Sequence, residues 1–330
     1  MVRLLGLALA GGAGWFAMSY FGLIDGSGRE GPAVEIAKEP FAGDRLQEET
    51  VKFDGKRAMA YLEKICELGP RMSGTPSMKK QQQLIRKHFE DLGAQVEFQT
   101  FSARQNSQPN PVEMANIIVS YQPEKKRRVI LCSHYDTRPI ADQEPDPRKW
   151  REKFVSANDG GSGVAFLMEM AHHMKGLKTA VGVDFVFFDG EEYIFERNRD
   201  KYFFGSEHFA QTWKKSKARP DYAAAILLDM IAGPNARFPV EGYSWLRAQG
   251  LCIDIWRIAA ELRCGAFLDR MGERVLDDHI ALQSAGIPAI DIIDFDYPHW
   301  HRLADVPDNC SPESMIQVAK VLSVWLQRVK

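Results

Sequence analysis

Four short apolar runs constrain the fold of this chain more than any other feature. They cover residues 129–132, 183–188, 223–228 and 289–293, and polar side chains hardly interrupt them. Continuous runs of this length are typical of strands buried on both faces, as in the centre of a parallel sheet. Because ligands bind beyond the carboxyl ends of strands in open α/β sheets, the residues after each run are the first candidates for a functional site.

Segments with a helical spacing of apolar residues separate these predicted strands. The predicted helices cover residues 57–68, 77–92, 163–175, 206–215, 245–262 and 312–328. Two alternating segments, 96–101 and 114–121, predict half-buried strands. This alternation predicts a three-layer α/β/α sandwich around a mostly parallel, mixed sheet. We expect residues 51–330 to form one catalytic domain.

The N-terminal segment predicts a location outside the cytoplasm. Residues 4–24 carry no charge, Arg3 precedes them and Asp25 follows. About 20 such residues can cross a bilayer as a helix, so residues 1–25 predict an uncleaved anchor. A cleaved signal peptide is the alternative, because Ala8-Leu9-Ala10 has the form of a cleavage site. The upstream positive charge places the catalytic part on the periplasmic or secreted side. Residues 26–50, rich in Gly, Glu and Pro, predict a linker.

Composition argues against several other classes of protein. The formal net charge is -2, and the basic run at 125–128 predicts a solvated turn before a strand, so we expect no nucleic-acid partner. The five cysteines are odd in number and form no Cys-x-x-Cys pair. That pattern argues against a disulfide framework or a cysteine-rich zinc site. We expect a monomer.

Histidine and carboxylate side chains follow all four apolar runs. They are His134 and Asp136, Glu191 and Glu192, Asp229, and, after a longer loop, His299 and His301. Zinc binds histidine nitrogen and carboxylate oxygen, and a catalytic zinc keeps one position open for water or substrate. Either His299 or His301 fits on sequence alone. Four other histidines lie in helical segments and are expected on the surface or in the core: His88, His172, His173 and His208.

Several acidic residues also have a competing structural interpretation. Asp159 precedes a predicted helix and is either its N-cap or a metal ligand that neighbouring glycines let a cation approach. Asp136 is either a turn residue or the acceptor that orients the imidazole of His134. Glu191 and Glu192 repel each other unless a cation offsets their charge. One can then bind metal while the other is a general base; an exposed acidic loop is the alternative.

The candidate residues together resemble a known family. They form the set His134-x-Asp136, Asp159-Gly-Gly-Ser-Gly, Asp189-Gly190-Glu191-Glu192, Asp229 and Trp300-His301, which resembles the zinc aminopeptidase superfamily. Within it the chain is similar to the glutaminyl-peptide cyclotransferases. The segments 227–235 and 276–280 resemble that branch, and Trp300 stands where peptidases more often carry tyrosine. The similarity extends from about residue 57 to the C-terminus.

The resemblance implies a fold and a role for each matched residue. The fold is that of the zinc aminopeptidases, which is phosphorylase/hydrolase-like. The resemblance implies that Asp159, Glu192 and His301 bind the catalytic zinc, and that His134 and Asp229 match the second-zinc ligands of the peptidases. It implies proton transfer by Glu191, with Asp277 in the hydrogen-bond network of Glu191, and a substrate pocket lined by Trp300 and Tyr297. Asp277 opens a further predicted helix, so an N-cap role is its alternative.

The expected activity is cyclisation of N-terminal glutamine to pyroglutamate, with one zinc and peptide or protein N-termini as substrates. A di-zinc aminopeptidase is the alternative. A non-catalytic receptor-type domain is the third possibility, and it should have lost ligands that are all present here. The chain also departs from the family. Arg197 lies near the position of a tryptophan that cyclases often carry, and the cysteine pair of animal cyclases has no counterpart. These departures leave substrate choice open.

Overall fold

The computed structural model describes residues 48–330. The predicted anchor at 4–24 and nearly all of the predicted linker lie outside the described residues, so the division into anchor, linker and catalytic domain stays a prediction. Among residues 48–330, no helix combines the length and the apolar character that a membrane span requires.

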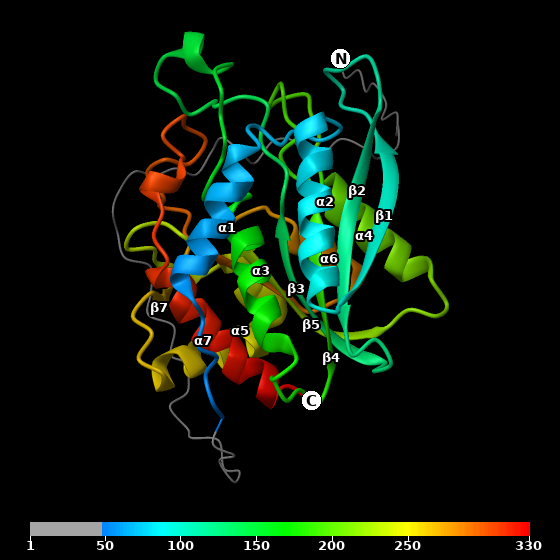
Figure 1. Ribbon diagram of the computed structural model, residues 1–330, viewed down its shortest axis with the longest axis vertical. Coiled ribbons are helices and arrows are strands. Elements are labelled where there is room, and N and C mark those ends of the chain that lie inside the picture. The colour runs from blue at the N-terminus through cyan, green and yellow to red at the C-terminus, as the bar shows by residue number, and fades with distance from the viewer. Residues whose placement is uncertain (1–47) are drawn as a thin grey trace, which may run out of the picture. The chain divides into compact units, whose positions relative to one another are not determined.

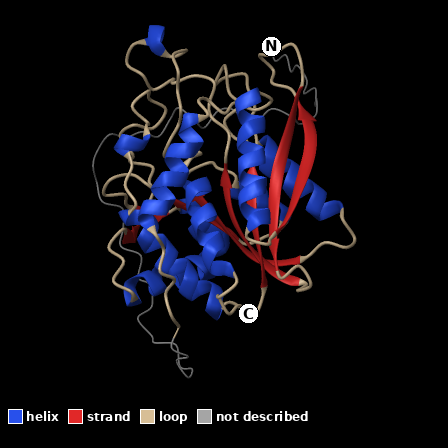
Figure 2. Ribbon diagram, in the orientation of Figure 1, coloured by secondary structure: helices blue, strands red, loops and turns tan. Residues whose placement is uncertain are grey.

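A six-stranded mixed sheet forms the centre of the described unit (Figure 2). Its strands, in spatial order, are β1 (Gln95–Ala103), β2 (Val112–Tyr121), β4 (Gly182–Phe188), β3 (Arg127–His134), β5 (Asp221–Asp229) and β8 (Ala289–Ile293). The four strands from β4 to β8 pair in parallel, whereas β2 is antiparallel to both of its neighbours. The predicted parallel core and mixed sheet are confirmed. The sequence patterns missed a small parallel pair, β6 (Phe238–Val240) and β7 (Phe267–Met271).

Helices cover both faces of this sheet, as the three-layer prediction requires. The first face packs against α1 (Gly55–Glu67), α2 (Pro76–Asp91), α3 (Ser162–Met174), α5 (Gly242–Glu261) and α7 (Glu313–Arg328). The opposite face packs against α4 (Phe204–Lys215) and α6 (His279–Ala285). Figure 1 shows α1, α2 and α3 on the near side of the strands and α4 beyond them. Two 3-10 turns, Pro147–Lys149 and Pro307–Asn309, lie in the loops.

The side chains of β3 alternate between the two faces of the sheet, which explains why its sequence is continuously apolar. Leu131 is fully buried in the core beneath α1 and α3, whereas Ile130 and Cys132 are fully buried in the core beneath α4. Successive residues of a strand point to opposite faces, so both parities must be apolar when both faces are covered. The prediction of doubly buried central strands is therefore confirmed for β3.

Three neighbouring strands end in the residues that matter for function. His134 is the last residue of β3 and pairs with Phe188, the last residue of β4. Asp229 is the last residue of β5, and the Glu pair begins three residues beyond Phe188. Since β3, β4 and β5 run parallel, these ends meet at one edge of the sheet. The sheet itself therefore brings residues from distant parts of the sequence together.

Candidate active site

The five predicted metal ligands converge at this edge of the sheet. Ligand atoms of Asp159, Glu192 and His301 lie within 4.8 Å of one another, and so do those of His134, Asp159 and Asp229. Asp159 belongs to both groups. A third group, within the same limit, joins His134 to Glu191 and Glu192.

His301 and its loop complete the first group. Its Nε2 lies 2.5 Å from Glu192 Oε1 and 3.3 Å from Asp159 Oδ2. The backbone of His301 adopts a left-handed conformation with φ of 52°, and its carbonyl accepts a hydrogen bond from the backbone N–H of Gln143. Such a conformation is unfavourable for a residue other than glycine, so surrounding contacts must maintain it. His299, the alternative ligand, lies outside all three groups and its ring contacts Tyr297.

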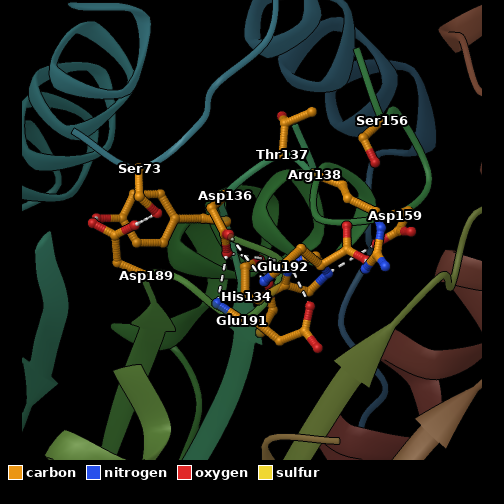
Figure 3. A network of polar contacts seen from close by, with 12 residues as sticks. Ser73, His134, Asp136, Thr137, Arg138, Ser156, Asp159, Asp189, Glu191 and Glu192 are labelled. Carbon is orange, nitrogen blue, oxygen red and sulfur yellow. Dashed lines mark hydrogen bonds and ion pairs between the residues drawn. The ribbon is translucent and has the colours of Figure 1, made fainter. Parts of the chain in front are cut away.

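His134 lies between the carboxylates of the second group. Its Nε2 is 3.1 Å from Asp159 Oδ1 and 3.4 Å from Asp229 Oδ1, while its Nδ1 is 3.6 Å from Asp136 Oδ1. Asp136 also accepts hydrogen bonds from the backbone N–H groups of Glu191 and Glu192, at 3.1 and 3.0 Å. Figure 3 shows Asp136 beside His134 and the Glu pair. One buried carboxylate thus fixes the position of both segments.

The glycine-rich segment places Asp159 and excludes its alternative role. The N-cap position of α3 belongs to Gly161, and no side chain caps that helix. The carboxylate of Asp159 instead faces the two imidazoles. Gly160 has φ of +75°, and a Cβ there would lie 2.6 Å from the carbonyl oxygen of Asp136 and 2.8 Å from His134 Cε1. Only glycine permits this approach between the segment and the end of β3.

The sequence analysis missed Asp305, which supports the same segment. Asp305 is fully buried and accepts hydrogen bonds from the backbone N–H groups of Asn158 and Asp159 and from the hydroxyl of Tyr297. Tyr297, a predicted substrate-pocket residue, is 3% exposed. Its assignment to substrate binding stays a prediction, and the structure gives its hydroxyl a supporting contact. The sequence signal that could have identified Asp305 was a carboxylate four residues after the predicted ligand His301.

Two further buried residues contact the ligands and were also missed. The guanidinium of Arg138 donates to Glu192 Oε1, and Asp142 Oδ1 lies 3.2 Å from Nδ1 of His301. Both belong to the segment after β3. Hydrogen bonds of this kind fix the orientation of metal ligands.

The residues predicted to handle protons are buried beside the ligands. Burial, and then the negative charge of Glu192, raise the pKa of Glu191 well above its ordinary value. Burial and the neighbouring carboxylates of Asp229 and Asp278 do the same for the pKa of Asp277. A carboxyl with a raised pKa can both accept and donate a proton near neutral pH. The ring of Trp300 lies 4.1 Å from that of His301, measured between centroids, and contacts Phe295. The catalytic and substrate roles of these residues stay predictions.

The donor set fits zinc. Within residues 48–330, the buried oxygens Asp159 Oδ2, Glu192 Oε2 and Asp229 Oδ1 have no hydrogen-bond partner. Buried charges without partners are costly unless a cation neutralises them. Burial alone would lower the pKa of His301, but the charge of Glu192 raises this pKa to about 10. The imidazole therefore holds a proton where a metal ion would bind and displace it. Imidazole nitrogen with carboxylate oxygen is a ligand set typical of catalytic zinc.

Comparisons with known proteins agree with this geometry. The model of peptidase family M28 matches residues 116–326. The glutaminyl-peptide cyclotransferase of Bothrops jararaca is 26% identical over 291 residues, covering 78% of this chain and 76% of that protein. The crystal structure of Fimbriiglobus ruber glutaminyl cyclase is 51% identical, with a TM-score of 0.84, and the match covers 86% of this chain and 97% of that one.

Zinc peptidases are also similar to this chain. A leucine aminopeptidase precursor from Bacteroides thetaiotaomicron is 30% identical with a TM-score of 0.78, over 86% of this chain and 99% of that one. A zinc-dependent exopeptidase from Parabacteroides distasonis is also 30% identical. The expected zinc aminopeptidase fold and the resemblance to cyclases are both confirmed. This chain belongs to peptidase family M28 and, within it, to the glutaminyl cyclases.

Proposed function

We propose that this chain is a zinc-dependent glutaminyl-peptide cyclotransferase that converts N-terminal glutamine of peptides to pyroglutamate and releases ammonia. The observation that carries the proposal is the group of Asp159, Glu192 and His301, whose ligand atoms lie within 4.8 Å of one another beside the buried carboxyl of Glu191. The 51% identity to a glutaminyl cyclase supports cyclisation as the reaction at that group.

Asp159, Glu192 and His301 would hold the catalytic zinc. When bound, zinc would supply Lewis-acid polarisation of the side-chain carbonyl of the substrate glutamine. Glu192 and His301 are 4 and 3% exposed, so the chain excludes bulk water from one side of the reacting carbonyl. Exclusion of water strengthens every electrostatic interaction at such a site.

Glu191 would move the protons. It accepts a proton from the neutral α-amine of the substrate as the amine nitrogen attacks the γ-carbonyl carbon. The new N–C bond closes a five-membered lactam, and the bond from that carbon to the amide nitrogen breaks. Glu191 returns the proton to this nitrogen, which leaves as ammonia. No water is consumed, and holding the amine close to the carbonyl supplies much of the rate.

Trp300 would bind the glutamine side chain. Its indole is partly buried and packs at a tilt against the ring of His301, so it lies at the side of the proposed metal site. A flat apolar surface in that place can pack against the aliphatic part of glutamine and keep water away. Asp277 would join the hydrogen-bond network of Glu191, as the family resemblance implies.

A di-zinc aminopeptidase is the second candidate function. The group His134, Asp159 and Asp229 favours it, because this group offers ligands for a second cation. Glu191 would then be the base that activates water. We propose one zinc for the cyclase and two for the peptidase.

An assay on a peptide with N-terminal glutamine separates the two functions. Cyclisation releases ammonia and leaves a peptide lighter by the mass of ammonia, whereas hydrolysis releases free glutamine. Chelation with dipicolinate should abolish either activity, and added zinc should restore it. Zinc content by elemental analysis should give about one zinc per chain. Free glutamine without ammonia, and two zincs, would replace the cyclase proposal by the peptidase.

We further propose that residues 4–24 anchor the chain and that the catalytic unit lies on the extracytoplasmic side, as a monomer. The uncharged character of this segment supports the anchor. Alkaline extraction of membranes should leave the chain in the pellet, and protease added to intact spheroplasts should digest it. Recovery in the soluble fraction with a shortened N-terminus would favour a cleaved signal peptide instead.

A further inference from the structure

One buried arginine contacts the zinc site, and the proposed reaction does not use it. Arg138 lies four residues after His134, and its side chain is 1% exposed. Its Nη1 donates to Glu192 Oε1 at 3.2 Å. Its Nη2 donates to Asp142 Oδ2 at 3.0 Å and to the hydroxyl of Tyr202 at 3.2 Å. Figure 3 shows the guanidinium beside Glu192 and Asp159.

Arg138 reaches a second ligand through Asp142. Asp142 Oδ2 accepts from Arg138, while Oδ1 of the same carboxylate lies 3.2 Å from Nδ1 of His301. Arg197 also donates to Asp142 Oδ2 from the other side. The Asp142 side chain is 1% exposed, so these contacts are made away from solvent. One guanidinium therefore contacts Glu192 directly and His301 through one carboxylate.

The charge of Arg138 differs in kind from the positive charges of the two imidazoles at the site. An imidazole must lose a proton to bind metal, so its positive charge and the metal exclude each other. A guanidinium keeps its charge at every pH that proteins tolerate. Arg138 therefore faces Glu192 with a full positive charge whether or not zinc is bound.

We propose that Arg138 is a positioning residue that acts as the permanent counter-charge of Glu192. It holds Oε1 of that carboxylate, while Oε2 is buried without a hydrogen-bond partner among the described residues and stays available to a cation. In the metal-free protein it shares Oε1 of Glu192 with Nε2 of His301, and of these two partners only Arg138 keeps its positive charge when the imidazole is neutral. Loss of this charge leaves a buried carboxylate less well compensated, which is destabilising.

A counter-charge role predicts different effects on the stability of the metal-free and the zinc-loaded protein, whereas a simple packing role does not. When zinc is bound, zinc itself compensates Glu192 and repels the nearby guanidinium. Arg138 must then stabilise the metal-free protein more than the zinc-loaded protein. By linkage, loss of its charge increases the stabilisation that zinc confers. The inference rests on the zinc site of the proposed function but not on its reaction, because a hydrolase would need the same compensation.

Thermal unfolding of the full chain in two metal states tests this role. Arg138→Gln should lower the Tm of the metal-free protein by roughly 5 °C or more, and that of the zinc-loaded protein by less than about half as much. The rise in Tm on adding zinc should therefore be larger than in the parent. Arg138→Lys keeps the charge and should restore most of the metal-free Tm. Equal losses in both states, or a smaller rise with zinc, would overturn the proposal.

Arg197→Gln is the matched control. It removes a guanidinium from the same carboxylate, Asp142, but no hydrogen bond or ion pair joins Arg197 to Glu192. It should change both metal states by similar amounts. A zinc-dependent asymmetry as large as that of Arg138→Gln would contradict a specific role for Arg138.

A double variant covers the case in which Arg138→Gln does not fold without metal. Adding Glu192→Gln removes the carboxylate whose charge Arg138 compensates, so the double variant should regain a metal-free Tm close to that of Glu192→Gln alone. Losses that simply add would refute the counter-charge role. These measurements need no turnover, so their failure is distinct from failure of the ammonia-release assay.

Discussion

The acid stability of the catalytic unit should depend strongly on one carboxylate remote from the zinc ligands. Glu169 lies on α3, which begins directly after the segment of Asp159, and its side chain is 0% exposed. It accepts hydrogen bonds from the backbone N–H of Asp54 and from Nε and Nη2 of Arg57, and it lies 3.1 Å from Nε2 of His173. It thereby joins the start of α1 to α3.

The magnitude follows from the pKa of Glu169. Although burial alone would raise it, the contacts with His173 and Arg57 lower this pKa from 4.5 to about 2. A depressed folded-state pKa stabilises the protein fully above the unfolded value of 4.5, and the contribution is lost as the pH falls towards 2. The full contribution is about 3 kcal/mol at neutral pH. Between pH 7 and pH 3.5 the loss is about 1.4 kcal/mol, a tenfold change in the unfolding constant.

Urea unfolding of the parent and of Glu169→Gln, at steps from pH 7 to pH 3.5, measures this loss. The effect of pH on zinc binding is common to both proteins, so the difference in their free energies of unfolding isolates Glu169. That difference should be largest at pH 7 and should shrink by about 1.4 kcal/mol at pH 3.5. Glu90→Gln removes an exposed carboxylate 3.9 Å from Arg86 and is the control for loss of one negative charge. A parent-to-variant difference that stays constant over this range would refute the reasoning.

Three further predictions concern the site itself. Glu191→Gln should lower kcat by about 10²–10⁴-fold while zinc content, measured by elemental analysis, stays at the parent value; a near-normal kcat would contradict the proton-transfer role. Gly160→Ala should weaken zinc binding in a chelator competition, because its Cβ would lie 2.6 Å from the carbonyl oxygen of Asp136 in a backbone with φ of +75°; unchanged affinity would mean that the segment moves freely. Trp300→Ala should raise KM for glutamine peptides by about tenfold or more with little loss of bound zinc; an unchanged KM would remove Trp300 from the substrate pocket.

The fold was predictable because burial leaves a strong trace in this sequence. Strands covered on both faces need apolar residues at both parities, and β3 and β5 carry such runs. Helix limits were less accurate. The helix predicted from residue 245 begins earlier in the structure, at Gly242. The side chain of Glu241 caps it by accepting hydrogen bonds from the backbone N–H groups of Tyr243 and Ser244. Glutamate is not among the residues that usually mark an N-cap, so the pattern gave no signal.

The convergence of the ligands was predictable from the topology of the sheet, whereas the residues that hold the ligands in place were not. Parallel strands end at one edge, so side chains that follow them must meet there. Arg138, Asp142 and Asp305 act from loops, whose course depends on tertiary contacts that no periodicity records. The residues alone could not decide between His299 and His301 for a similar reason. The loop conformation, with φ of 52° at His301, determines which imidazole faces Glu192.

The second ligand group bears on whether the site needs one cation or two. The imidazole of His134 lies near both carboxylates of this group, because its Nε2 is 3.4 Å from Asp229 Oδ1 and 3.1 Å from Asp159 Oδ1. Nδ1 of His134 in turn lies 3.9 Å from Glu191 Oε2. A protonated His134 can therefore compensate the second group and also face the proton-transferring carboxyl. Cyclisation supplies its own nucleophile from the substrate and has no water to activate. In the proposed one-zinc cyclase, an imidazolium at His134 would compensate these carboxylates in place of a second zinc, whereas the proposed di-zinc hydrolysis would require His134 to give up its proton to metal.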